Sequence, residues 1–227
     1  DIFLWAIIPG VLTVILSLAL KDVSDPLPIV APKFSWTMVG MPTKFKRYLL
    51  AVGLFTLGCS SDMFLLLRAK DLGVSSSDVA FLWAGVNLIA SVFSIPLSAL
   101  SDRWGRRRVL LMGWFSYIVF YIAMSLLTSA NIWLFLIFAG YGLFKAATEG
   151  VEKALVADLA PEGLTGTAFG WFNLISGVML FPASFIFGWL YESHSSMVAF
   201  EFSALSSLLA ILVLYFWVFK SPKNISE

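Results

Sequence analysis

The sequence predicts an all-α polytopic membrane protein with about seven transmembrane helices. Three observations predict this fold class: the composition, the length of the apolar runs, and the uneven placement of the basic residues between those runs. Hydrophobic residues make up 59% of the 227 residues, and charged residues make up 13%. Soluble domains average about 25% charged residues, so a chain this apolar is expected to have lipid as the solvent for most of its surface.

Seven apolar stretches are long enough to cross a bilayer as helices, because a hydrocarbon core about 30 Å thick needs about 20 helical residues. Helices are expected since backbone groups in lipid must be satisfied within the segment. The expected spans are 2–20, 46–68, 79–100, 109–128, 131–156, 166–190 and 197–219. They divide the chain into a first helix (1–20), a proline-containing linker (21–45), a six-helix unit (46–220) and a short tail (221–227).

The basic residues predict the orientation, because Lys and Arg concentrate in cytoplasmic loops. Twelve of them fall on one set of loops, two (Arg68 and Lys70) fall on the opposite set, and Lys145 lies within a span. The twelve are Lys21, Lys33, Lys44, Lys46, Arg47, Arg103, Arg106, Arg107, Arg108, Lys153, Lys220 and Lys223. We therefore expect the N-terminus outside, the linker and the C-terminus in the cytoplasm, and a location in a bacterial inner membrane.

An internal repeat divides the six-helix unit into two halves of three helices. Matching residues recur in the same order in the two halves, which run from 46 to 128 and from 131 to 219. The matched pairs are Asn87 with Asn173, Pro96 with Pro182, Ser98 with Ser184, and Asp62 with Glu149. Three spans is an odd number, so the two halves should have opposite orientations, which is how many secondary transporters are built.

The loop between the third and fourth spans carries the most specific motif. Residues 100–108 read Leu-Ser-Asp-Arg-Trp-Gly-Arg-Arg-Arg. This stretch resembles the signature loop of the major facilitator superfamily, G-x-x-x-D-[RK]-x-G-[RK]-[RK]. The matching residues are Asp102, Arg103, Gly105, Arg106 and Arg107, whereas Ser98 stands where the family has its leading glycine.

The resemblance implies an architecture for nearly the whole chain. The first helix looks like the sixth helix of the family, the linker like its central cytoplasmic loop, and the remainder like its C-terminal half. The resemblance also implies that the arginine loop forms a cytoplasmic gate, with Glu152 of the fifth span as a further member. The alternative is that the arginines only anchor the topology. We expect Arg103, Arg106 or Arg107 to lie near Glu149 or Glu152 if the gate exists.

Charged residues inside the spans are the candidate proton-coupling or cavity residues, because such groups are costly in lipid and commonly functional. They are Asp62, Lys145 and Glu149. Asp62 either exchanges protons or is a carboxylate satisfied by hydroxyl groups or by a cation from another part of the protein. Lys145 either faces a central cavity or pairs locally with Glu149, four residues away on the same helix face. Asn87 and Asn173 are expected to bond between helices rather than to contact a substrate.

The function predicted from these features is secondary active transport of a small solute by alternating access, coupled to protons. The alternatives are a seven-helix receptor and a folded half that serves only as an interaction module. A membrane-embedded enzyme is not expected, since the single histidine, His194, lies in a loop and no paired catalytic carboxylates occur. With the single cysteine, Cys59, no metal site or cofactor is expected.

The expected partners follow from the same organisation. They are membrane lipid, an N-terminal half that precedes this chain in a longer protein, and an unidentified small-molecule substrate, with no nucleic acid. The polar faces bearing Asp62, Lys145 and Glu149 would lack a partner in this chain alone, so we also expect that two copies can pair as a homodimer.

Overall fold

The computed structural model describes residues 2–19 and 37–219. The chain divides into two units, 1–33 and 34–227, and the first unit contributes helix α1 (Ile2–Ala19), with an apolar stretch at Gly10–Ala19. Most of the predicted linker and the predicted tail, with Lys21, Lys33, Lys220 and Lys223, lie outside the described residues.

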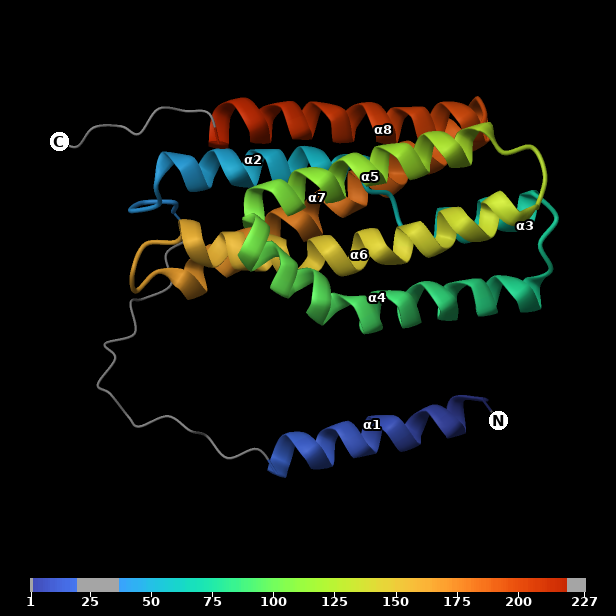
Figure 1. The fold of residues 1–227 in the computed structure, drawn as a ribbon, viewed down its shortest axis with the longest axis horizontal. Coiled ribbons are helices and arrows are strands. Elements are labelled where there is room, and N and C mark those ends of the chain that lie inside the picture. Colours follow the sequence, from blue (N-terminus) through green and yellow to red (C-terminus); the bar gives the residue numbers. More distant parts are fainter. Residues whose placement is uncertain (1, 20–36, 220–227) are drawn as a thin grey trace. The chain divides into compact units, whose positions relative to one another are not determined.

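The second unit is a bundle of antiparallel helices (Figure 1). Its elements are α2 (Thr43–Gly58), α3 (Met63–Asp71), α4 (Ser76–Trp104), α5 (Arg106–Leu126), α6 (Ile132–Leu159), α7 (Thr165–Ser193), α8 (Ser196–Val213) and a π-helical turn, η1 (Leu214–Phe219). With α2–α3 and α8–η1 each taken as one pass, six helical segments of the described chain are apolar and long enough to cross a membrane. The predicted all-helical fold is thus confirmed.

The helix boundaries follow local chemistry. The side-chain oxygens of Ser75, Asn131 and Ser195 accept backbone N–H groups in the first turns of α4, α6 and α8, as polar N-cap residues do. Gly105 separates α4 from α5 with a φ of 91°. A residue with a side chain is strained in this region, so the glycine of the arginine loop permits the sharp turn between the two helices.

The packing of the helices follows the predicted repeat. Helices α2–α3, α4 and α5 form the first three-helix unit. They correspond to α6, α7 and α8–η1 of the second unit, respectively. The α2–α8 and α2–α7 contacts of the structure have their counterparts in the α6–α5 and α6–α4 contacts. Figure 1 shows α2 and α6 running in opposite directions, as an inverted repeat requires.

Close helix contacts repeat in the same way at the level of residues. A Cβ atom placed on Gly142 of α6 would lie 3.1 Å from side-chain atoms of Ile89, and one placed on Gly53 of α2 would lie 3.3 Å from Ile175. Ile89 and Ile175 are matching positions of the two units. Small residues therefore let α4 approach α6, and α7 approach α2, at the matching isoleucines, although Gly53 and Gly142 are themselves two residues out of register.

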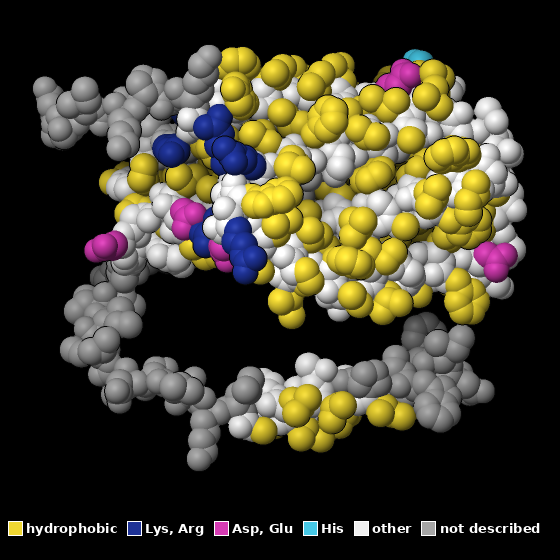
Figure 2. All heavy atoms as spheres, viewed as in Figure 1, with side chains coloured by type: hydrophobic (Ala, Val, Ile, Leu, Met, Phe, Trp, Pro, Cys, Tyr) yellow, Lys and Arg dark blue, Asp and Glu magenta, His cyan; other side chains and the backbone are white. Residues whose placement is uncertain are grey.

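Burial differs sharply between the helices. In α4 and α7, 6% and 11% of the most apolar stretch is buried, whereas the other four passes bury 39–50%. Figure 2 shows that hydrophobic side chains cover most of the visible face of the bundle and that Lys and Arg side chains gather toward one end. We call this end, which holds the arginine loop of residues 103–108 and the start of α2, the basic end.

Candidate functional site

A break in the first pass of the bundle organises the candidate site. The span predicted at 46–68 as one helix is instead two helices, because α2 ends at Gly58 and α3 begins at Met63. The intervening residues are Cys59, Ser60, Ser61 and Asp62. Ser and Asp side chains compete with helical hydrogen bonds by bonding to nearby backbone groups, and the Ser61 hydroxyl accepts the Met63 N–H at 3.4 Å.

Neighbouring helices satisfy the backbone groups that the break releases, as lipid-embedded irregular backbone requires. The Tyr117 hydroxyl donates to the Gly58 carbonyl oxygen at 3.0 Å. The Ser206 hydroxyl also donates to the Leu54 carbonyl oxygen at 2.9 Å, four residues before the end of α2 and not at a group freed by the break. The Ser61 N–H donates to the Ser184 hydroxyl at 3.2 Å. Helices α5, α8 and α7 thus hold the break from three sides.

Gly58 lets the break pack directly against α8. A Cβ atom at this position would lie 2.8 Å from the Ser203 carbonyl oxygen and 2.9 Å from the Ser207 hydroxyl oxygen. No side chain fits there without a shift of the backbone. The end of α2 is therefore fixed by contact with a neighbouring helix as well as by the polar residues that follow it.

Asp62, at the end of the break, forms an ion pair with Lys145 of α6. The Lys145 Nζ atom lies 2.8 Å from Asp62 Oδ2, and the Tyr141 hydroxyl donates to Asp62 Oδ1 at 2.5 Å. Both carboxylate oxygens therefore have a partner. The side chains of Lys145 and Asp62 are 27% and 28% exposed, so the pair is only partly enclosed by the chain.

Aromatic rings surround the ion pair on the bundle side. The Lys145 ammonium group lies 5.0 Å from the centre of the Trp83 ring of α4, within the range of a cation–π contact. Tyr141 also packs against Phe144 and Tyr117. These rings cover part of the pair. Helix α4 contributes Trp83 to it, and α7 contributes Ser184 to the neighbouring break.

The remaining charges of α6 do not join this pair. Glu149 pairs with Lys153 at 3.2 Å on an exposed face. The local Lys145–Glu149 pair, one of the two alternatives for Lys145, is thus not the arrangement in the structure. Glu152 accepts a hydrogen bond at 2.8 Å from the indole Nε1 of Trp114 in α5, which places its carboxylate between α5 and α6.

The arginine loop contacts the basic end of α6, but through a different acid from those predicted. Arg106 lies 2.5 Å from Asp158 and 3.4 Å from Asp102, and it donates to the Ala154 carbonyl oxygen at 3.2 Å. Its partner is therefore Asp158 rather than Glu149 or Glu152. Glu152 and Glu149 lie about 1.7 and 2.5 turns before Asp158 on α6, and the Glu152 carboxylate is bonded to Trp114 of α5 instead.

Two other arginines of the motif take separate positions. Arg107 lies over the rings of Tyr215 and Phe219, 5.1 and 4.8 Å from their centres, and so joins the start of α5 to the end of α8–η1. Arg103 is exposed. The motif thus connects α4, α5, α6 and η1 at the basic end.

The repeat-related asparagines are exposed on the two least buried helices. Asn87 donates to the carbonyl oxygen of Trp83 at 2.8 Å within α4, and Asn173 is exposed on α7. Asn87 is thus bonded within its own helix, and not to another helix as expected.

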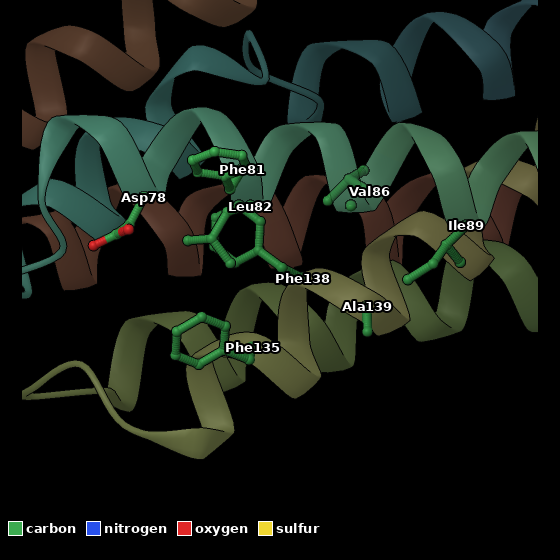
Figure 3. A pocket seen from close by; sticks show the side chains of 9 residues that line it. Asp78, Phe81, Leu82, Val86, Ile89, Phe135, Phe138 and Ala139 are labelled. Atoms are coloured by element: carbon green, nitrogen blue, oxygen red, sulfur yellow. The ribbon is translucent and has the colours of Figure 1, made fainter.

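A cavity of about 370 Å³ lies along the seam between α4 and α6, away from the ion pair. Figure 3 shows its lining of Phe81, Leu82, Phe135 and Phe138, with Asp78 at one end. Neither Asp62 nor Lys145 lines it. We therefore place the candidate site at the ion pair rather than in this cavity.

Sequence reasoning missed the helix break and the role of Tyr141. The run Cys-Ser-Ser-Asp was the available signal for the break, because three of these residues favour local hydrogen bonds over helix continuation. Tyr141 stands four residues before Lys145 and so shares its helix face. Which residue of α2–α3 would meet that face depends on the rotation of two helices about their axes, and hydropathy does not specify it.

Six apolar passes, a broken helix with an ion pair at the break, and an inverted repeat are together features of membrane transporters. The sequence pattern described as Major Facilitator Superfamily matches residues 48–227. The chain therefore belongs to this superfamily of membrane proteins.

Several proteins are similar to this chain. An uncharacterised MFS-type transporter of Methanocaldococcus jannaschii is 33% identical over 77% of this chain and 45% of its own length. The class B tetracycline resistance protein of Escherichia coli is 29% identical over 66% of this chain and 38% of its own. An uncharacterised transporter of Buchnera aphidicola is 28% identical over 59% and 34%. The chain thus spans less than half the length of these relatives.

Proposed function

We propose that this chain supplies the second half of a secondary active transporter that moves a small solute by alternating access coupled to protons. The observation that carries the proposal is the broken first pass, which presents Asp62 to Lys145 and Tyr141 of the repeat-related helix α6. Discontinuous helices of this kind form the substrate and coupling-ion sites of many secondary transporters. Intramembrane charges are rarely retained without a function.

The chemistry of the pair supports proton coupling through Asp62. A deprotonated Asp62 attracts the Lys145 ammonium group, whereas a protonated Asp62 keeps the hydrogen bond to Tyr141 but loses this attraction. Protonation would thus loosen the connection between the α2–α3 pass and α6. A solute that carries charge could compete for either partner. We propose that exchange between proton and solute at this pair biases the bundle between two conformations.

The partial exposure of the pair, with α4 and α7 as neighbours of the pair and of the break, supports a pathway along these two helices. These two helices bury the least of their apolar surface, so this face is available to a second six-helix unit. In such an arrangement the pathway runs between the two units, and Asp62 and Lys145 line it from this side.

We further propose that the basic end is cytoplasmic and that the Arg106–Asp158 pair acts as a gate there. The pair connects the start of α5 with the last turns of α6, and Lys and Arg favour the cytoplasmic side. In the full transporter, Arg106→Gln should raise the labelling rate of a cysteine placed at Ala154. An unchanged rate would leave the arginines as topology anchors.

Proton flux in proteoliposomes tests the proposed function. The full transporter that contains this chain would be reconstituted with a pH-sensitive dye inside, and candidate solutes would be added, beginning with tetracycline because one relative is named for resistance to it. We expect solute-dependent proton movement in the wild type and in Glu192→Gln, which changes an exposed acid at the end of α7, but not in Asp62→Asn. Solute movement without proton movement in the wild type would contradict the coupling.

A further inference from the structure

A second concave surface lies at the basic end, on the α4–α5–α6 side of the bundle. It is a groove of about 320 Å³ that is lined by residues of α4, α5 and α6. We call it the basic-end groove. Its lining residues are Leu97, Leu100, Trp104, Val109, Met112, Gly113, Ser116, Phe120, Gly140, Leu143, Phe144 and Ala147.

The floor of the groove forms where two glycines bring α5 and α6 together. A Cβ atom on Gly113 would lie 2.3 Å from the Thr148 side chain, and one on Gly140 would lie 2.5 Å from the Phe120 ring. These contacts form a narrow floor. The α4 wall runs from Leu97 to Trp104, seven residues or roughly 10 Å of helix rise, so the groove follows the helix axes.

The lining is apolar and well exposed. Trp104, Met112 and Leu143 are 53%, 58% and 41% exposed. The only side-chain heteroatoms in the lining are the Trp104 nitrogen, the Met112 sulfur and the Ser116 hydroxyl, and this hydroxyl donates to its own helix at the Gly113 carbonyl oxygen. An occupant that runs along the groove therefore has to be apolar along its length.

The mouth of the groove is positively charged. Arg103 is adjacent to Trp104 and three residues after Leu100, and Arg108 is four residues before Met112, so helix spacing puts both arginines beside the lining. Both are exposed, and within the described part of the chain neither forms an ion pair. Arg106 and Arg107 are engaged by Asp158 and by aromatic rings, respectively.

The start of α5 adds to the positive character of the mouth. Its N-cap residue, Gly105, makes no side-chain cap, so the first N–H groups of this 21-residue helix face the same end. The helix dipole favours an anion at this position. An anionic group at the mouth would thus meet two arginines and a helix N-terminus.

We propose that the basic-end groove binds one anionic phospholipid, with an acyl chain against α6 and the phosphate group at Arg103, Arg108 and the start of α5. The direction of the groove fits a lipid, because it runs along the helices and its charged mouth is at their ends. Basic pockets between transmembrane helices bind anionic headgroups in this manner. A free phosphate ion would use the mouth but not the apolar groove.

Fluorescence quenching by brominated lipids tests this proposal on the chain itself. The 227-residue chain would be placed in dioleoylphosphatidylcholine bilayers containing a small fraction of phosphatidylglycerol or phosphatidylcholine with brominated acyl chains. The signal of Trp104 is the difference between wild type and Trp104→Phe. We expect brominated phosphatidylglycerol to quench Trp104 at a much lower mole fraction than brominated phosphatidylcholine.

Two charge-matched double variants separate the groove from general surface charge. Arg103→Gln/Arg108→Gln should weaken the binding of phosphatidylglycerol by about ten- to thirty-fold, as expected for two basic residues near a headgroup. Lys44→Gln/Lys46→Gln removes the same charge from exposed positions at the start of α2 and should leave binding within about two-fold of wild type.

Four outcomes would overturn the proposal. Equal quenching of Trp104 by the two lipids would show no headgroup preference. Equal losses in both double variants would show a general electrostatic effect. Displacement of the lipid by inorganic phosphate alone would show a free-anion site. Protection of Trp104 from both lipids would show that protein, such as a second copy, covers the groove. The wild-type comparison remains decisive even if the arginine variant folds poorly.

Discussion

At the scale of single residues, the central feature is that Lys145 pairs across the bundle with Asp62 rather than along its own helix with Glu149. Both residues were recognisable as candidates from the sequence, because charges are costly in an apolar segment. Their mutual pairing was not recognisable, since a lysine on α6 has an acid four residues away and another on a different helix. In the structure, Lys145 forms an ion pair with Asp62, and Lys153 forms one with Glu149.

The two pairs predict different effects on stability. Removing one partner of a buried pair leaves an uncompensated charge. We expect Lys145→Met to lower the free energy of unfolding by about 2 kcal/mol, a value kept small because both side chains are partly exposed. The double variant Asp62→Asn/Lys145→Met should recover most of this loss. Denaturant unfolding in detergent micelles, followed by tryptophan fluorescence, would measure the cycle.

The exposed Lys153–Glu149 pair is the matched control for this cycle. Its side chains are 54% and 69% exposed, and such pairs contribute little. Lys153→Met should therefore change the unfolding free energy by less than about 0.5 kcal/mol. Equal effects of Lys145→Met and Lys153→Met, with no recovery in the double variant, would argue against a structural Asp62–Lys145 pair.

At the scale of helices, the number and the apolar character of the passes could be predicted from the sequence, but the break at residues 59–62 could not. Hydropathy is averaged over about 20 residues, so the four residues of the break have little weight in it and the average does not reveal the break. The predicted partner of the arginine loop was also wrong, for a geometric reason. Glu149 and Glu152 have suitable charge, but the loop lies at the depth of Asp158. Sequence spacing gives positions along one helix and not the depth at which a neighbouring loop meets it.

A pair of glycine variants tests whether contact with α8 fixes the end of α2. In Gly58→Ala the new methyl group would meet the Ser203 carbonyl oxygen at 2.8 Å, so we expect a loss of stability of about 1–3 kcal/mol from overpacking. Gly177→Ala, where no neighbouring atom lies within 4 Å of the new group, should be neutral or stabilising because alanine favours the helix. Thermal unfolding in detergent measures both. A tolerated Gly58→Ala would show that α2 and α8 are not in fixed contact.

At the scale of the whole molecule, α4 and α7 expose most of their apolar surface, together with Asn87 and Asn173. The chain covers less than half of the length of its relatives, and we propose that the face of α4 and α7 meets a second six-helix unit in a full-length transporter. We propose that, in this chain by itself, the same face pairs with a second copy. Such a pair would cover the exposed side of Asp62 and Lys145.

Cysteine crosslinking tests the pairing of copies. In a Cys59→Ser background, Asn87→Cys or Asn173→Cys on the α4–α7 face should form disulfide-linked dimers on oxidation in bilayers. Val119→Cys, an exposed position on α5 (47% exposed), is the matched control and should stay monomeric. Equal crosslinking at all three positions would indicate random collisions, and none at any of them would indicate that this face is covered by lipid alone.

The most direct test of the central claim, that Asp62 couples proton movement to solute movement, compares two modes of transport in the full protein with Asp62→Asn. Asparagine keeps the size of the side chain and can accept the Tyr141 hydrogen bond, but it cannot exchange a proton. We predict that solute exchange across proteoliposomes at equal pH persists while accumulation driven by a pH gradient is lost. Accumulation at the wild-type level would contradict the claim and remove Asp62 from the coupling mechanism.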